Sequence, residues 1–119
     1  MSLTVLVVDD DDGFRRLVSR MLKSWGLTVL GEAGTSAEGL ERTAQLRPDV
    51  VLVDVGLPDG DGFALTQQLV GLPWQPKVVV ISSDADRANA AAAHDAGAAG
   101  FVAKEELPGA SARTLISGA

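Results

Sequence analysis

The segment VLVVDDDD, residues 5–12, places four aliphatic residues directly before four aspartates. A continuous run of β-branched and aliphatic residues is typical of a strand that is covered on both faces of a parallel sheet. Four like charges at the end of such a strand repel one another. Either the aspartates begin the next helix, or a cation lies among them. The rest of the chain decides between these two interpretations.

Short apolar runs of this kind recur along the chain. We expect strands at Thr4–Val8, Leu27–Leu30, Val50–Val53, Val78–Ile81 and Gly100–Ala103. Segments with helical spacing separate them, and we expect helices over about 14–25, 35–47, 62–71, 86–96 and after Pro108. Five alternations of strand and helix predict an α/β fold, with a five-stranded parallel sheet and helices on both of its faces.

The composition limits the classes of function. The chain has 119 residues, 46% of them hydrophobic, a net charge of -6 and no cysteine. We therefore expect one domain over residues 1–119, and neither a disulfide nor a thiol nucleophile. Without a basic cluster, we expect no direct binding of nucleic acid. Without a signal peptide or a long apolar run, we expect no membrane contact and a cytoplasmic location.

Two of the expected helices differ in the size of the residues on their apolar faces. The first carries a stripe at helical spacing, which we expect to face the core, namely Phe14, Leu17, Val18, Met21, Leu22 and Trp25. The fourth, from Asp86 to Ala96, has no large aliphatic residue, so its core-facing positions are alanines between Ala88 and Ala96. Because an alanine buries little apolar area, we expect this helix to be held loosely to the sheet. The alternative is that the small residues only allow the helix to pack closely on the sheet.

Polar residues stand at the carboxyl ends of the expected strands. Asp9 and Asp10 follow the first strand, Asp54 ends the third, Ser82 ends the fourth and Lys104 ends the fifth. In parallel sheets these ends meet at one edge, where ligands bind. Three carboxylates without histidine or cysteine favour a hard cation such as Mg²⁺. The remaining two aspartates of the opening run, Asp11 and Asp12, are assigned to the cap of the first helix.

Other motifs in the chain carry less weight. The segment Asp59–Gly62 resembles part of a calcium-binding EF loop, but in that register the first ligand would be Leu57. His94 is the only histidine and has no catalytic partner in the sequence, so we expect it to face solvent or to pack against its neighbours rather than to act in catalysis or phosphotransfer.

The strand-end residues together resemble the receiver domain of two-component response regulators. The resemblance rests on Asp9-Asp10, on Asp54 within VLVDVGLPDGDG, on Ser82 after VVVI and on Lys104 after AGAAGFVA. It implies a flavodoxin-like (βα)5 fold with strand order 2-1-3-4-5. It also implies that Asp54 accepts a phosphoryl group from a sensor histidine kinase, and that the domain is no turnover enzyme.

The resemblance also implies roles for the other residues. Asp9, Asp10 and Asp54 would hold Mg²⁺ together with the backbone carbonyl of Gly56. Lys104 would contact the phosphoryl group. Two further positions would form the switch, namely Ser82 and Phe101.

The resemblance further implies that phosphorylation changes the face formed by the fourth helix, the fifth strand and the fifth helix. This face would bind a second receiver or an effector, and the output would be transcription through a DNA-binding domain absent from this chain. Many receivers have proline after the lysine, whereas Lys104 precedes Glu105 here, as in receivers attached to helix-turn-helix transcription factors. Phe101 replaces the commoner tyrosine. We expect either a stand-alone regulator or an excised domain.

Two alternatives remain at the level of sequence. A Mg²⁺-dependent phosphatase with an aspartate nucleophile would need an acid–base aspartate two residues later, where this chain has Gly56. A pseudo-receiver would bind partners without being phosphorylated. All the key positions are filled, which favours the phosphorylated receiver.

Overall fold

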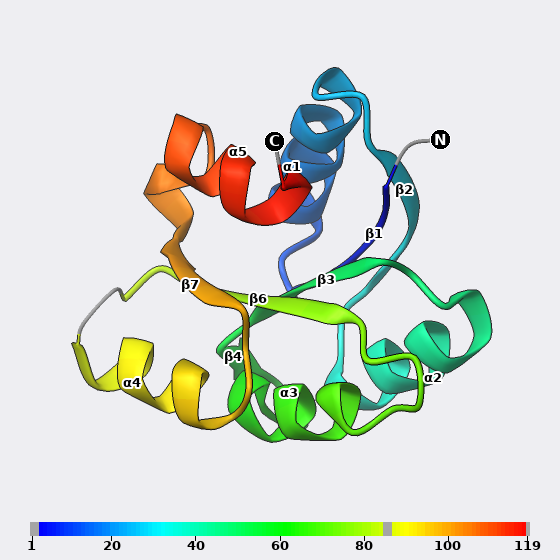
Figure 1. Cartoon of the computed structure of the whole chain (residues 1–119), viewed down its shortest axis with the longest axis vertical. Coiled ribbons are helices and arrows are strands. Elements are labelled where there is room, and N and C mark those ends of the chain that lie inside the picture. Colours follow the sequence, from blue (N-terminus) through cyan, green and yellow to red (C-terminus); the bar gives the residue numbers. More distant parts are fainter. Residues whose placement is uncertain (1–2, 85–86, 119) are drawn as a thin grey trace.

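A parallel sheet of five strands forms the centre of the molecule (Figure 1). The computed structural model describes residues 3–84 and 87–118. The strands lie in the order β2-β1-β3-β6-β7. Their bounds are Thr4–Val8 for β1, Thr28–Ala33 for β2, Val50–Asp54 for β3, Lys77–Ser82 for β6 and Gly100–Ala103 for β7. Because β6 and β7 are the fourth and fifth strands of the sheet, the predicted order 2-1-3-4-5 is confirmed.

Helices cover both faces of the sheet, as predicted (Figure 1). One face carries α1 (Asp12–Ser24) and α5 (Ala110–Ser117), and the other carries α2 (Ser36–Leu46), α3 (Gly62–Val70) and α4 (Arg87–Asp95). The core has two halves because successive strand residues point to opposite faces. In β1, Val5 and Val7 pack on the side of α1 and α5, while Leu6 and Val8 pack on the side of α3.

The sheet extends beyond several of the predicted bounds. β2 continues to Ala33, where Gly31, Glu32 and Ala33 pair with the last three residues of β1. Glycine and glutamate are weak strand formers, and so the sequence pattern ended the strand too early. Three short elements were not predicted, namely β4 (Gly56–Leu57), β5 (Gly60–Asp61) and the 3-10 turn η1 (Lys104–Glu106).

The start of α1 separates the two aspartates that were assigned to its cap. Asp11 is the N-cap, and its side chain accepts a hydrogen bond from Phe14 N at 3.1 Å. Asp12 is instead the first helical residue, and its carboxylate forms an ion pair with Arg15. The prediction is thus confirmed for Asp11, whereas Asp12 contributes only its charge to the first turn.

The apolar stripe of α1 is narrower than predicted. Val18 and Leu22 are buried, but Leu17 is 64% exposed, and so its assignment to the core was wrong. Successive helical residues are about 100° apart, which turns Leu17 away from the arc centred on Val18 and Leu22.

The helix α4 has the small apolar face that the sequence indicated. Ala93 is its buried residue among those whose side chains the structure describes, and Ala88 is exposed. The predicted first residue, Asp86, lies outside the described residues. His94 is exposed, which decides for solvent over packing among its two expected roles. Within the described ranges, no helix has the length and apolarity needed to span a membrane.

Candidate functional site

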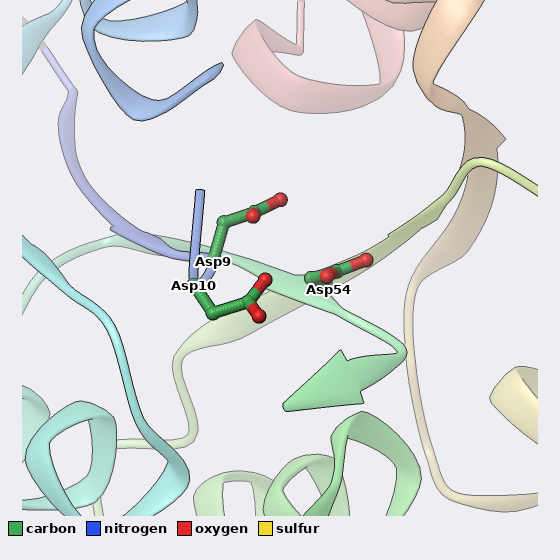
Figure 2. Close-up of side chains that lie close together, drawn as sticks. All are labelled: Asp9, Asp10 and Asp54. Atoms are coloured by element: carbon green, nitrogen blue, oxygen red, sulfur yellow. The ribbon is translucent and has the colours of Figure 1, made fainter. Parts of the chain in front are cut away.

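Three aspartates from two neighbouring strands meet at the carboxyl edge of the sheet (Figure 2). Asp9 follows β1 and is fully buried, Asp54 is the last residue of β3 and is 7% exposed, and Asp10 is exposed. Each residue offers a carboxylate oxygen, and these oxygens lie within 4.8 Å of one another. They meet because β1 and β3 are paired in parallel, with Val8 opposite Val53, so that both strands end at the same level.

Lys104 reaches the carboxylates from the end of β7, the strand at one edge of the sheet. It follows β7 directly, and its Nζ lies 2.6 Å from Asp9 Oδ2 and 3.5 Å from Asp54 Oδ1. The ammonium also lies 4.2 Å from the centroid of the Phe14 ring, in the range of a cation–π contact. The lysine is therefore held between two carboxylates and an aromatic face.

The two oxygens of the Asp9 carboxylate have different surroundings. Oδ1 accepts a hydrogen bond from Asp11 N at 2.9 Å. Oδ2 is buried, and the ammonium of Lys104 lies 2.6 Å from it. Because a carboxylate oxygen has two lone pairs, Oδ2 keeps the capacity to bind a metal cation beside the lysine.

The backbone of Asp9 is held by a residue that the sequence analysis missed. Arg15, on α1, donates a hydrogen bond to the Asp9 carbonyl oxygen, and its Nε donates to Glu32 Oε1 at 3.1 Å. Glu32 also accepts a hydrogen bond from Ser19 Oγ at 3.2 Å. Arg15 and Ser19 on the helix are 17 and 13 positions before Glu32 on the strand. No local sequence pattern connects residues so far apart, so this network could not be predicted from the sequence.

The site shifts the proton affinity of the central carboxyl group. Burial raises the pKa of Asp54 from 3.8 to about 6, the nearby Asp9 carboxylate adds to the rise, and Lys104 opposes it. Desolvation by itself would lower the pKa of Lys104, but the Asp9 and Asp54 carboxylates hold it above 10.5. The cluster is therefore short of positive charge even with the lysine in place.

The donor set fits a small divalent cation. All three groups offer carboxylate oxygens, which are the ligands that Mg²⁺ prefers. These oxygens lie within 4.8 Å of one another, so that one ion could contact all three. Three carboxylates and one ammonium leave an excess negative charge that a divalent ion would balance.

The other predicted residues surround this cluster. Ser82 is the last residue of β6, and its Oγ donates to Asp84 O at 2.9 Å and accepts from Asp84 N at 3.0 Å. Phe101 lies on β7, half-buried against the core half that contains Val8. Among the described residues, no hydrogen bond joins Ser82 to the three aspartates.

The glycine that contacts the site most closely is Gly62, which the sequence analysis did not single out. A Cβ atom there would lie 2.2 Å from Asp54 O, so only glycine fits. Gly56, the predicted carbonyl ligand, begins β4 and is exposed, and a Cβ atom there would meet nothing within 4 Å. The pattern Asp61-Gly62 at the start of a helix was the available signal.

Comparison with known proteins identifies the family. Residues 5–112 match the family model described as the response regulator receiver domain. The chain belongs to this family. It is thus a receiver domain of the kind found in two-component response regulators, and its carboxylate edge is the acidic pocket of that fold.

The relatives of this receiver differ in the rest of their length. It is 37% identical over 100 residues to the KDP operon transcriptional regulatory protein KdpE of Escherichia coli, covering 84% of this chain and 44% of KdpE. It is 40% identical over 109 residues to protein-glutamate methylesterase/protein-glutamine glutaminase 6 of Anaeromyxobacter dehalogenans, covering 91% of this chain and 31% of the methylesterase. The receiver therefore spans less than half of either protein.

A solved structure has the same fold. It is a response regulator protein from Burkholderia pseudomallei with a phosphorylated aspartic acid, a calcium ion and citrate. The TM-score is 0.85 at 25% identity, over 96% of this chain and 66% of that chain.

Proposed function

We propose that Asp54 of this receiver accepts a phosphoryl group from a phosphohistidine of a sensor histidine kinase in the cytoplasm. One carboxylate oxygen of Asp54 attacks phosphorus, the bond from phosphorus to the donor nitrogen breaks, and an acyl phosphate forms. The observation that carries the proposal is the contact of Lys104 with both Asp9 and Asp54 at the carboxyl edge. It supports Asp54 as the acceptor because the ammonium lies beside the nucleophile, where charge on the phosphoryl oxygens would develop.

The cofactor in this proposal is Mg²⁺. Asp9, Asp10 and Asp54 would hold it with the carbonyl of Gly56, and a bound Mg²⁺ would offset the repulsion between the carboxylate and the phosphoryl oxygens. The buried carboxylate of Asp9, which a single ammonium neutralises together with Asp54, supports this assignment, as does the raised pKa of Asp54. The B. pseudomallei relative, with its phosphorylated aspartic acid and calcium ion, supports both parts.

Acetyl phosphate tests this proposal without a cognate kinase. Intact mass should rise by one phosphoryl group in the presence of Mg²⁺, and should not rise in excess EDTA or in Asp54→Asn. A pseudo-receiver would gain no mass under any condition. A phosphatase would instead release phosphate continuously from p-nitrophenyl phosphate, at a rate that Asp54→Asn abolishes. Either of these two results would contradict the proposal.

The surface beside Lys104 suits a protein donor. A groove of about 140 Å³ lies between α1 and the segment after β7, and it is lined by Phe14, Leu17, Val18, Met21, Lys104, Leu107 and Pro108. Leu17 is exposed at its rim, and Lys104 connects the groove to Asp54. We infer that the histidine kinase contacts this groove.

Leu17→Ser tests this inference. The substitution should slow phosphoryl transfer from a histidine kinase severalfold and leave labelling by acetyl phosphate unchanged. Equal effects on both donors would contradict the inference.

The output that we propose is transcription control. The receiver resembles part of KdpE, a transcriptional regulator, and Glu105 stands where many receivers have proline. A phosphorylation-dependent homodimer through α4, β7 and α5 would carry the signal to a DNA-binding domain. We further propose that residues 1–119 act as one receiver domain.

A further inference from the structure

The N-terminus of α2 is completed by a carboxylate from a distant loop. Asp59 Oδ1 accepts a hydrogen bond from Ser36 N at 2.7 Å, and Asp59 Oδ2 accepts one from Ala37 N at 3.0 Å. The first four N–H groups of a helix have no partner within it. Glu38 N donates to the side chain of Thr35, and the N–H of residue 39 makes the first hydrogen bond within the helix, to the Thr35 carbonyl. Asp59 thus accepts from two of the N–H groups that have no partner within α2.

The same carboxylate belongs to the loop that follows Asp54. Asp59 lies between β4 and β5, where Gly56 pairs with Asp61. The base of this loop is closed by the hydrogen bond from Gly62 N to Val55 O at 2.8 Å. Its tip is joined to α2 through Asp59. The backbone that carries the Gly56 carbonyl is therefore held at both ends.

We propose that Asp59 is a positioning residue for the phosphoryl-transfer site, and that its two bonds to α2 hold the Gly56 carbonyl near Asp54. This inference rests on the function proposed above. Asp59 lies outside the cluster of three aspartates, and so it acts through the loop and touches neither the metal nor the phosphoryl group.

Two further observations support a role beyond capping. α2 already has a cap of its own in Thr35, whose side chain accepts from Glu38 N at 3.1 Å. The N–H groups of Ala37 and Ser36 also hold the pKa of Asp59 below 3.8, so this carboxylate stays ionised with both oxygens free to accept. An asparagine offers one accepting oxygen in place of two and carries no charge, so it would hold the two N–H groups less firmly.

The proposal predicts a change in metal affinity. In Asp59→Ala the loop tip is released from α2, and the Kd for Mg²⁺ should rise by about 10-fold, the lower end of the range for residues that orient metal ligands. The rate of labelling by acetyl phosphate at low Mg²⁺ should fall with it, and saturating Mg²⁺ should restore the rate. Asp59→Asn should give an intermediate Kd.

Thr35→Ala is the matched control. It removes a cap from the same end of α2 but leaves the loop tip attached, so it should lower Tm in EDTA about as much as Asp59→Ala does. We would measure Tm, Kd for Mg²⁺ from amide chemical shifts, and acetyl phosphate labelling for all four proteins. A raised Kd in Asp59→Ala with a wild-type Kd in Thr35→Ala supports the inference.

The outcomes separate the two proposals. This inference alone is overturned if wild-type protein binds Mg²⁺ and is labelled but both Asp59 variants keep the wild-type Kd for Mg²⁺. The same holds if Thr35→Ala raises the Kd as much as Asp59→Ala. Wild-type protein that takes up neither Mg²⁺ nor a phosphoryl group overturns the proposed function and this inference with it. Should Asp59→Ala fail to fold, the Kd of Asp59→Asn decides.

Discussion

Asp54 combines features that oppose one another in the absence of a cation. It is nearly buried beside Asp9, which disfavours its charged form, yet its proposed chemistry needs a carboxylate. Lys104 removes only part of the conflict, since its ammonium also contacts Asp9. The site therefore holds unfavourable electrostatic free energy that a divalent cation would relieve.

This conflict makes the stability of the fold depend on pH. The folded pKa of Asp54, about 6, exceeds the ordinary value of 3.8, so the folded state binds the proton more tightly. The contribution of Asp54 to the free energy of unfolding must then fall as pH rises from about 4 to 6. In EDTA, Asp54→Asn should be more stable than wild type at pH 7.5 by about 1 kcal/mol, because solvent reduces the full effect of the shift.

Urea unfolding at several pH values measures this difference. The gap between Asp54→Asn and wild type should close near pH 4. Asp95→Asn, which removes an exposed carboxylate of α4, is the control and should show no such gap. A gap of the same size at pH 4 and pH 7.5 would contradict the account.

At the residue scale, the sequence predicted the contacts that strand geometry dictates. Asp9, Asp10, Asp54 and Lys104 meet because parallel strands end at one edge. The supporting contacts of Arg15 and Asp59 were not predictable. Each joins a side chain to a partner on a different element, and such pairing depends on tertiary packing that no periodicity encodes.

At the scale of elements, α3 and α4 differ in how firmly they are held. Both helices have nine residues, but α3 buries Leu65, Thr66 and Leu69, whereas α4 buries Ala93 among its described side chains. At about 25 cal/mol per Å² of apolar area, a buried leucine anchors a helix much more firmly than an alanine does. A change at Ser82 and Phe101 would thus move α4 more easily than α3.

Amide hydrogen exchange tests this difference. In the metal-free protein, amides of α4 should exchange at least about 10-fold faster than those of α3, which corresponds to about 1.4 kcal/mol in opening free energy. Adding Mg²⁺ and beryllofluoride should change protection between residues 87 and 104. Equal protection of both helices, or changes confined to the loops of the site, would show that α4 does not carry the signal.

The elements that sequence analysis missed are short. β4 and β5 have two residues each, and η1 has three, so none is long enough to show a period. The five sheet strands and five helices were predictable because each repeats its pattern over at least four residues. The exposure of Leu17 could not be predicted, because the width of the buried face of a helix depends on the elements that pack against it.

At the scale of the whole molecule, the proposed metal site should be linked to the stability of the fold. A ligand that binds only the folded state stabilises it by RT ln(1 + [L]/Kd), which is about 1.4 kcal/mol for 10 mM Mg²⁺ if the Kd is about 1 mM. The Tm of wild type should rise accordingly, and that of Asp10→Asn much less. Putrescine, an organic dication, at the same 10 mM concentration as the Mg²⁺ of this about 1.4 kcal/mol prediction, controls for screening of surface charges. A Tm rise that Asp10→Asn fully retains would put the metal elsewhere.

The account as a whole depends on which side chain receives the phosphoryl group. Borohydride reduces an aspartyl phosphate to homoserine, which peptide mass spectrometry then locates in the chain. After treatment with acetyl phosphate and Mg²⁺, we predict homoserine at position 54 and at no other aspartate. Homoserine at position 9 or 10, or a stable phosphoryl group on Ser82, would contradict the assignment of Asp54 as the acceptor.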